Sequence, residues 1–176
     1  TDSIQVLEPT PLLIVIDSAI NIDCNGNPSG SIFTSTTGGT LGYTYAWDNT
    51  TAITEDINSL SANTYEVIVT DANACMDTAN TTITEPVSLT INSGTDSVLC
   101  NAGNDGIAFT NVLGGTLPYT YIWNDPATTT NDTASNLTPG SYIVNVTDSQ
   151  NCMISDTIEV FEPQPIVMAF DITNVS

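Results

Sequence analysis

In several short runs of the chain, every second residue is a large apolar one. Tyr43, Tyr45 and Trp47 share one parity, and so do Tyr65, Val67 and Val69. Successive side chains of a β-strand point to opposite faces, so each run would place its large apolar side chains on one face. These faces are predicted to form the core. No segment shows a convincing amphipathic-helix period.

Short β-rich runs of this kind are separated by turn signals every 8 to 12 residues, which is typical of a β-sandwich. The sequence therefore predicts an all-β fold made of immunoglobulin-like β-sandwiches. In the first half, strands are expected near residues 12–20, 31–35, 43–47, 53–60, 64–71 and 79–84. In the second half, they are expected near residues 88–91, 106–112, 119–123, 128–137, 141–148 and 155–161.

The pattern occurs twice, which predicts a tandem array. The stretch 38–47 (GGTLGYTYAW) returns at 114–123 (GGTLPYTYIW), 76 positions later, and residues 1–9 (TDSIQVLEP) align with residues 155–163 (SDTIEVFEP). We expect an elongated array with almost no free linker, cut from a longer chain or completing a neighbour. Its parts are the last strand of a preceding repeat (1–9), a first repeat (10–86), a second repeat (87–163) and the first strand of a following repeat (164–176).

Charge excludes several functions. The chain has no Lys, Arg or His and 20 acidic residues, for a formal charge of −20. Binding to nucleic acid or to an anionic membrane needs cations, and no apolar run is long enough for membrane insertion. Catalysis would have to rely on a carboxylate pair, as in glycosidases, and nothing marks such a pair. We expect no enzyme and no catalytic residue.

A hydrophobic content of 40% indicates a folded chain.

Each repeat contains two cysteines, Cys24 and Cys75 in the first and Cys100 and Cys152 in the second. Four cysteines allow three connectivities, and pairing inside each repeat is the simplest. Such a disulfide would close a loop of about 50 residues and contribute about 3–4 kcal/mol in the chain-entropy model. It implies an oxidising, extracellular setting. A metal site is the alternative for four cysteines, but the chain has no CxxC pair and no His.

The ordered motifs of both repeats resemble those of a known family. They are CNGxxxGSI in the first repeat, where the second has CNAGNDG, then GGTxxYxYxW and LxxxxYxVxVTDxxxC in both, and the closing TITEP of the first repeat. The series is similar to the SprB-type repeat of gliding-motility adhesins and other giant surface proteins of Bacteroidota, with a weaker likeness to PKD-type immunoglobulin-like domains. The resemblance implies a secreted, cell-surface adhesin or extracellular filament. Where the family usually has Gly before the second cysteine, this chain has Ala74 and Asn151.

Two kinds of modification or ligand site are predicted beside the core. The triplet of Asp, then Ser or Thr, then an aliphatic residue resembles the O-glycosylation sequon of the same bacteria, and it occurs more often than chance predicts. The candidate hydroxyls are those of Ser3, Ser18, Thr78, Ser97, Thr133 and Thr157. Oxygen ligands near each second cysteine are candidates for calcium, with Asx turns as the alternative. They are Asp71, Asn73, Asp77, Asp148, Asn151 and Asp156.

Taken together, these patterns predict a disulfide-stapled, glycosylated rod at the cell surface. Its partners would be neighbouring repeats or copies of itself in a fibre, and surface polysaccharide is a further candidate. The alternative is a carbohydrate-binding module, in which exposed aromatic rings hold a sugar. Burial of Trp47 and Trp123 distinguishes the two, because a sugar platform needs these rings at the surface.

Overall fold

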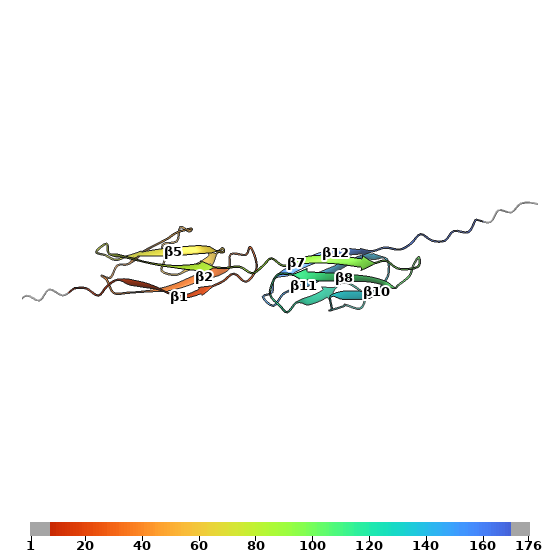
Figure 1. Ribbon diagram of the computed structural model, residues 1–176, viewed down its shortest axis with the longest axis horizontal. Coiled ribbons are helices and arrows are strands. Elements are labelled where there is room, and N and C mark those ends of the chain that lie inside the picture. Colours follow the sequence, from red (N-terminus) through yellow and green to blue (C-terminus); the bar gives the residue numbers. More distant parts are fainter. Residues whose placement is uncertain (1–7, 170–176) are drawn as a thin grey trace, which may run out of the picture. The chain divides into compact units, whose positions relative to one another are not determined.

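The computed structural model describes residues 8–169. Over this range the chain forms twelve β-strands and no helix, as the alternation predicted (Figure 1). The chain divides between Ser88 and Leu89 into two compact units of six strands each. We call them unit 1 and unit 2. In the described range there is thus no helix of the length and apolar character needed to cross a bilayer.

Unit 1 is a sandwich of two antiparallel three-stranded sheets. One sheet has the order β1-β2-β4 and the other the order β3-β5-β6. The strands are β1 (Leu13–Ile20), β2 (Gly30–Thr37), β3 (Thr44–Trp47), β4 (Ile57–Leu60), β5 (Asn63–Thr70) and β6 (Met76–Ile83). The chain enters unit 1 at one end of the strands and leaves it at the other (Figure 1).

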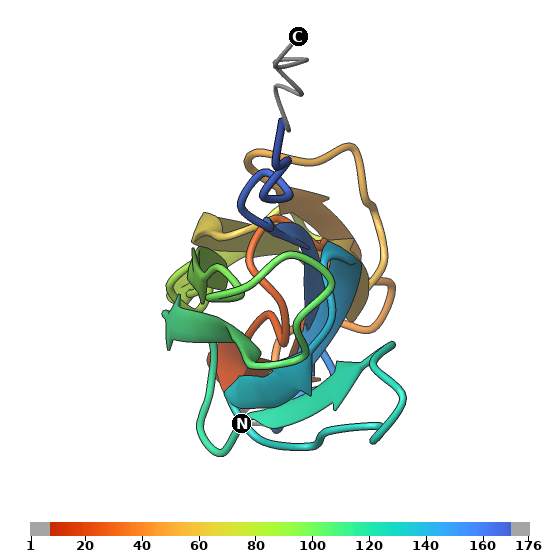
Figure 2. The same cartoon turned by 90° about the vertical axis from the view of Figure 1, so that its right-hand side faces the viewer.

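Unit 2 repeats this topology, with sheets of order β10-β8-β7 and β12-β11-β9. Its strands are β7 (Thr90–Asp96), β8 (Gly106–Leu113), β9 (Thr120–Trp123), β10 (Thr133–Leu137), β11 (Gly140–Thr147) and β12 (Met153–Val160). The end-on view in Figure 2 looks along these strands from the side on which the chain leaves unit 2. The fold class predicted from the sequence is confirmed.

One strand is longer than the sequence indicates. Residues 88–91 were expected to form a short strand, yet β7 continues to Asp96. Gly94 lies opposite Phe109 in the ladder, and a Cβ at Gly94 would lie 2.5 Å from Cζ of Phe109. The aromatic ring therefore covers the bare backbone of the glycine. This packing compensates for the low strand propensity of Gly94.

The core of each unit lies between its two sheets. In β5, Tyr65, Val67 and Val69 are buried and alternate with polar or exposed neighbours. Trp47 lies on the same sheet and is 6% exposed, while its counterpart Trp123 in unit 2 is 1% exposed. The predicted core faces are confirmed. Fully buried side chains of this size are the main contribution to the stability of so small a unit.

A double-glycine turn brings each chain start against the body of its unit. Gly38 has a φ of 73°, and a Cβ there would lie 1.9 Å from the carbonyl oxygen of Pro11. The neighbouring Gly39 donates its N–H to the carbonyl oxygen of Thr10 at 2.8 Å. Only glycine combines this conformation with so close a backbone contact. Gly39 also has a positive φ, of 57°.

The two predicted flanking strands fall largely on residues outside the description. Residues 1–7, most of the expected last strand of a preceding repeat, lie outside the described range. Of the expected strand 164–176, residues 164–169 are described and have no strand structure. Within them, Ile166 is 95% exposed and Val167 is 84% exposed. This short apolar segment therefore has no covering layer within unit 2.

Candidate functional site

The end at which the chain enters unit 1, its leading end, is organised by one carboxylate. Asp71 follows β5 and is buried. Its Oδ2 accepts the N–H of Thr40 at 2.9 Å, and its Oδ1 accepts the N–H groups of Asn73 and Cys75, each at 2.8 Å. The N–H of Asp71 donates to the carbonyl oxygen of Cys75 at 2.9 Å. The carboxylate thus joins the loop before β3 to the loop before β6 and fixes Cys75 at this end.

Unit 2 builds the same arrangement around Asp148. Its Oδ2 accepts the N–H of Thr116 at 2.8 Å, and its Oδ1 accepts those of Gln150 and Cys152, each at 2.9 Å. In both loops the residue before the cysteine has a left-handed backbone conformation, with φ of 63° at Ala74 and 66° at Asn151. This conformation explains why the related repeats favour glycine there.

Hydrogen bonding lowers the pKa of both carboxyl groups. For Asp71 the N–H of Thr40 is the main cause, and the N–H groups of Cys75 and Asn73 add to it against the effect of burial. For Asp148 burial raises the pKa, but the N–H groups of Thr116, Cys152 and Gln150 together outweigh it, so the pKa lies below its usual value. Both side chains are therefore charged over the whole neutral range.

Stability is expected to pass through a maximum near the acid end of the pH scale. From pH 7 to about 4, protonation of exposed acids relieves the repulsion within a chain of charge −20, so the free energy of unfolding rises. Because the native pKa values of Asp71 and Asp148 lie below the usual 3.8, their contribution is complete above that pH and is lost as the pH falls through the native values. Urea unfolding followed by Trp fluorescence between pH 2 and 7 measures this. A steady rise down to about pH 2 would contradict it.

The opposite, trailing end of each unit holds the other cysteine. In unit 1 the N–H of Ile22 donates to the carbonyl oxygen of Thr84 at 3.0 Å, just after β6. Asn25 Nδ2 donates to the carbonyl oxygen of Pro86 at 3.0 Å, and the N–H of Gly26 donates to Glu85 Oε2 at 2.8 Å. These bonds fix the loop that contains Cys24 beside the C-terminal end of β6.

The trailing end of unit 2 has the same bonds. Asn101 Nδ2 donates to the carbonyl oxygen of Pro163 at 3.1 Å, and the N–H of Ala102 donates to Glu162 Oε2 at 2.7 Å. Cys100 therefore lies beyond the C-terminal end of β12. We call Cys75 and Cys152 the leading cysteines, and Cys24 and Cys100 the trailing cysteines.

The predicted pairing of cysteines inside each repeat is wrong. Cys75 directly precedes β6 and Cys24 lies at its far end, so an eight-residue strand of about 26 Å separates them. A disulfide needs Cα atoms within about 4–7 Å. Cys100 and Cys152 are separated by β12 in the same way. In the structure Cys24 and Cys152 each take part in a disulfide, whereas Cys75 and Cys100 are free and exposed.

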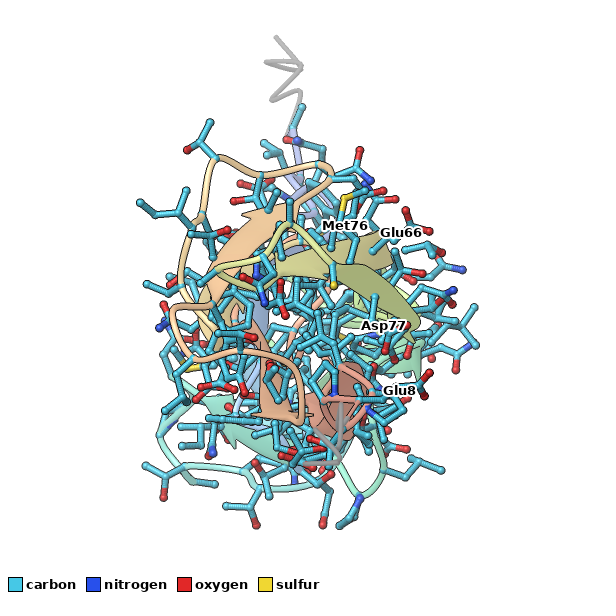
Figure 3. All side chains as sticks on the ribbon, turned by 90° about the vertical axis from the view of Figure 1, so that its left-hand side faces the viewer. Glu8, Glu66, Met76 and Asp77 are labelled. Carbon is cyan, nitrogen blue, oxygen red and sulfur yellow. The ribbon has the colours of Figure 1, made fainter. Side chains whose placement is uncertain are left out.

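The calcium candidates lie near each other in sequence but are turned to different partners. Figure 3 views unit 1 from its leading end, with Met76 and Asp77 labelled at the start of β6. Oδ2 of Asp77 accepts the N–H of Ile14 at 2.9 Å, and Oδ1 of Asp156 accepts the N–H of Thr157 at 2.8 Å. Among residues 8–169, no three acidic or cysteine side chains are grouped to hold a metal ion. Calcium binding stays a prediction.

The predicted glycosylation sites are accessible wherever they are described. Ser18, Thr78, Ser97, Thr133 and Thr157 are all exposed. Ser3 lies outside the described residues. Exposure is a requirement for a glycan and not evidence of one, so O-glycosylation stays a prediction.

The aromatic rings are mostly turned inward. Trp47 Nε1 donates to the carbonyl oxygen of Thr54 at 2.9 Å, and Trp123 Nε1 donates to that of Asn131 at 2.8 Å. The hydroxyl of Tyr43 donates to the carbonyl oxygen of Gly38. Both tryptophans are therefore unavailable as a sugar platform. The tyrosines on the same strands are only half-buried.

One groove in unit 2 leaves tyrosine rings accessible. It has a volume of about 510 Å³ and is lined by Tyr119, Tyr121, Thr130, Asn131, Asp132 and Thr133. Burial, together with the nearby charge of Asp132, raises the pKa of Tyr121, so this hydroxyl remains protonated at neutral pH. The groove therefore presents aromatic, hydroxyl, amide and carboxylate groups together.

Sequence reasoning missed a third buried carboxylate. Asp125 is 3% exposed, and its oxygens accept the N–H of Thr129 at 2.7 Å and the hydroxyl of Thr129 at 2.9 Å. It closes the loop after β9. The signal in the sequence is only an Asp-Pro step after a strand, which is common in turns.

Two stacked antiparallel sheets with this strand order, repeated along the chain, define the class of tandem immunoglobulin-like β-sandwiches. Within that class, the family model of the SprB repeat matches the chain twice, over residues 17–52 and 92–128. Each unit therefore contains one stretch that is similar to the SprB repeat. The resemblance indicated by the sequence motifs is confirmed.

Solved structures similar to the chain consist of immunoglobulin domains. One is described as the structural basis for Dscam isoform specificity, at 13% identity and TM-score 0.36. The match covers 88% of this chain and 46% of that one. A second is Down Syndrome Cell Adhesion Molecule isoform 1.30.30, N-terminal eight Ig domains, at 13% identity and TM-score 0.47, covering 88% of this chain and 25% of that one. A third is DIP-gamma IG1+IG2, at 11% identity and TM-score 0.42. The match covers 85% of this chain and 96% of that one.

The chain thus spans less than half the length of the first two of these structures. The fold assignment rests on the strands and sheets described above, because all three scores are below 0.5. No curated protein matches the chain.

Proposed function

We propose that this chain is a structural segment of a secreted bacterial surface adhesin or extracellular filament. The observation that carries the proposal is the presence of two SprB repeats in tandem, since SprB repeats occur in surface adhesins. Each repeat is a small sandwich whose chain enters at one end of the strands and leaves at the other. Such a module extends a chain with every copy added. Its proposed role is to hold other parts of the adhesin or filament at a distance from the cell. No catalytic residue is assigned.

Charge supports the same role. All 20 ionisable acids are unopposed by any Lys, Arg or His, so neighbouring copies repel each other side by side. O-glycans on the exposed hydroxyls would add a hydrated layer over the strands and protect open sheet edges, a function that edge lysines serve in many proteins. A glycosylated, acidic surface favours separate, soluble filaments over lateral aggregates.

Surface labelling tests the proposal. Antibodies raised against residues 1–176 are expected to label intact cells of the source organism as strongly as permeabilised cells, and electron microscopy with gold-labelled antibody should show label away from the outer membrane. Label that appears only after permeabilisation would refute a surface role.

Mass spectrometry of the native chain tests the glycans separately. Hexose-type mass increments are expected on peptides that contain Ser18, Thr78, Ser97, Thr133 or Thr157. A chain with a bare polypeptide mass would refute glycosylation and leave the structural role intact.

A second candidate function is carbohydrate binding in the groove of unit 2. The observation in its favour is the set of half-buried tyrosines beside Asn131 and Asp132, since sugars bind to aromatic faces next to amide and carboxylate groups. Titration calorimetry with cell-surface polysaccharide, on the wild-type chain and on Tyr121→Ala, tests it. Heat that is lost in the variant supports binding, and equal heats from both chains refute this site.

A further inference from the structure

The cysteines of the two units occupy the same two local positions. Both leading cysteines donate their N–H to a buried carboxylate, Cys75 to Asp71 and Cys152 to Asp148. Each trailing cysteine precedes an asparagine that donates to a proline carbonyl just after the last strand of its unit. These backbone bonds hold the corresponding cysteines of the two units in corresponding positions. A leading or trailing cysteine should therefore be able to form the same kind of disulfide as its counterpart in the other unit.

One cysteine of each kind is disulfide-bonded and the other is free. The leading Cys152 and the trailing Cys24 are bonded. The leading Cys75 and the trailing Cys100 are free and exposed. Because the two cysteines of one unit lie too far apart to bond to each other, a disulfide of either free thiol would have to reach a cysteine outside its own unit.

Exposed apolar side chains lie near each free thiol. A pocket of about 400 Å³ at the trailing end of unit 2 is lined by Leu99, Cys100, Asn101, Pro163, Gln164, Pro165 and Ile166. Leu99 is 82% exposed. At the leading end of unit 1, Met76 is 70% exposed next to Cys75, and Leu41, which follows Thr40 of the Asp71 cluster, is 83% exposed. Contact between a trailing and a leading end would bury these side chains and bring unlike cysteines together.

We propose that Cys75 and Cys100 each form a disulfide with a cysteine of the other kind on another SprB repeat. Cys75 takes a trailing cysteine and Cys100 takes a leading one, so repeats are cross-linked head to tail. This inference rests on the proposed structural role and names the partner of each end. The partner repeat belongs either to a second copy of this chain or to the same, longer polypeptide.

The bond can form by exchange with a low-molecular-mass disulfide such as oxidised glutathione. One thiolate attacks the glutathione disulfide and releases one reduced glutathione, leaving a mixed disulfide. The thiolate of the second repeat then attacks the protein sulfur and releases the second reduced glutathione. Two protein thiols are oxidised to one disulfide, and one glutathione disulfide is reduced to two thiols.

The test uses the full chain and two matched variants, Cys75→Ser and Cys100→Ser. Each variant keeps one free thiol as well as Cys24 and Cys152. Under a glutathione redox buffer, either variant alone is expected to remain monomeric, because like ends do not fit. An equimolar mixture should give a dimer whose linked peptides contain Cys75 and Cys100, and the wild-type chain should give a ladder of oligomers on a non-reducing gel.

A tandem fusion distinguishes the two sources of partner. Joining residues 1–163 with Cys75→Ser to residues 10–176 of a second copy with Cys100→Ser keeps the sequence period, because residues 155–163 align with residues 1–9. Of the four thiols that are free in the two copies, this fusion keeps only Cys100 of the first copy and Cys75 of the second. If the partner is a neighbour in one polypeptide, peptide mapping should find Cys100 of the first copy bonded to Cys75 of the second, in a monomeric product. If it is a second copy, the fusion should form intermolecular ladders instead.

Several outcomes would overturn the inference. Dimers of Cys75→Ser alone, linked through Cys100 to Cys100, would show that exposure and not complementarity decides the pairing. The absence of any Cys75 to Cys100 peptide in both the mixture and the fusion would refute it as well. Neither result bears on the surface labelling of intact cells, so failure here is distinct from failure of the structural role.

Discussion

Replacing Trp123 with alanine is expected to lower the free energy of unfolding of unit 2 by about 3–5 kcal/mol, the range for removing a buried aromatic side chain. Trp123 is 1% exposed and packs in the same core as Val144 and Val146. The substitution removes its contacts with both sheets and leaves the carbonyl oxygen of Asn131 without its indole donor. A unit of this size has little stability to spare, so partial unfolding of unit 2 at 37 °C is the expected result.

Fluorescence separates the two units in this experiment, because the chain has only two tryptophans, one in each. In the Trp123→Ala variant, Trp47 reports unit 1, and calorimetry or circular dichroism records the loss in unit 2. The matched control is Ile122→Ala, the adjacent residue on β9, which is 62% exposed and should change stability by less than about 0.5 kcal/mol. A loss below about 1 kcal/mol in Trp123→Ala would show that the ring does not support the core.

Replacing Asp148 with alanine is expected to have the second-largest effect, a loss of about 2–4 kcal/mol in unit 2. Its carboxylate accepts three backbone N–H groups, all of which lose this acceptor in the variant. Without it, the loops before β9 and β12 lose the carboxylate that links them. Two backbone bonds still connect them, from the N–H of Ser149 to the carbonyl oxygen of Thr116 at 2.9 Å and from the N–H of Asp148 to that of Cys152 at 3.0 Å. Urea unfolding at pH 7 measures the loss.

Charge must be controlled in that measurement, because removing any acid from this chain relieves repulsion. Glu159→Ala removes the same charge from an exposed position on β12 and should be neutral or slightly stabilising. Asp148→Asn keeps one acceptor oxygen and should fall between the wild type and Asp148→Ala. Equal stability of Asp148→Ala and Glu159→Ala would contradict a structural role for the carboxylate.

The strands and the core were predictable because they follow from alternation within short segments. Residues 65–69 show their buried face directly, and the 76-residue offset between 38–47 and 114–123 carries each assignment from one repeat to the other. The extension of β7 was not predictable, because it depends on the pairing of Gly94 with Phe109 from another strand. Contacts between distant segments are invisible to a local pattern.

The cysteine pairing failed for a related reason. The number of residues between Cys24 and Cys75 predicts the entropy of closing a loop, but not the end of the sandwich at which each residue lies. That depends on the direction of β6, which begins directly after Cys75 and ends beside the loop of Cys24. Both Asp71 and Asp148 sit in the same Thr-Asp-x-x-x-Cys motif, but the motif did not show that each carboxylate accepts three backbone N–H groups from two loops.

The first and last strands of unit 1 have a mechanical consequence. β1 and β6 run in the same direction, since Ile14 bonds to Asp77 near their beginnings and Ile22 bonds to Thr84 just beyond their ends. Tension on the chain would pull the start of β1 and the end of β6 in opposite directions along their length. The contacts between β1 and β6 then all carry the shear force together, so they must break almost simultaneously. A repeat built in this way resists stretching more than one whose end strands can be peeled apart bond by bond.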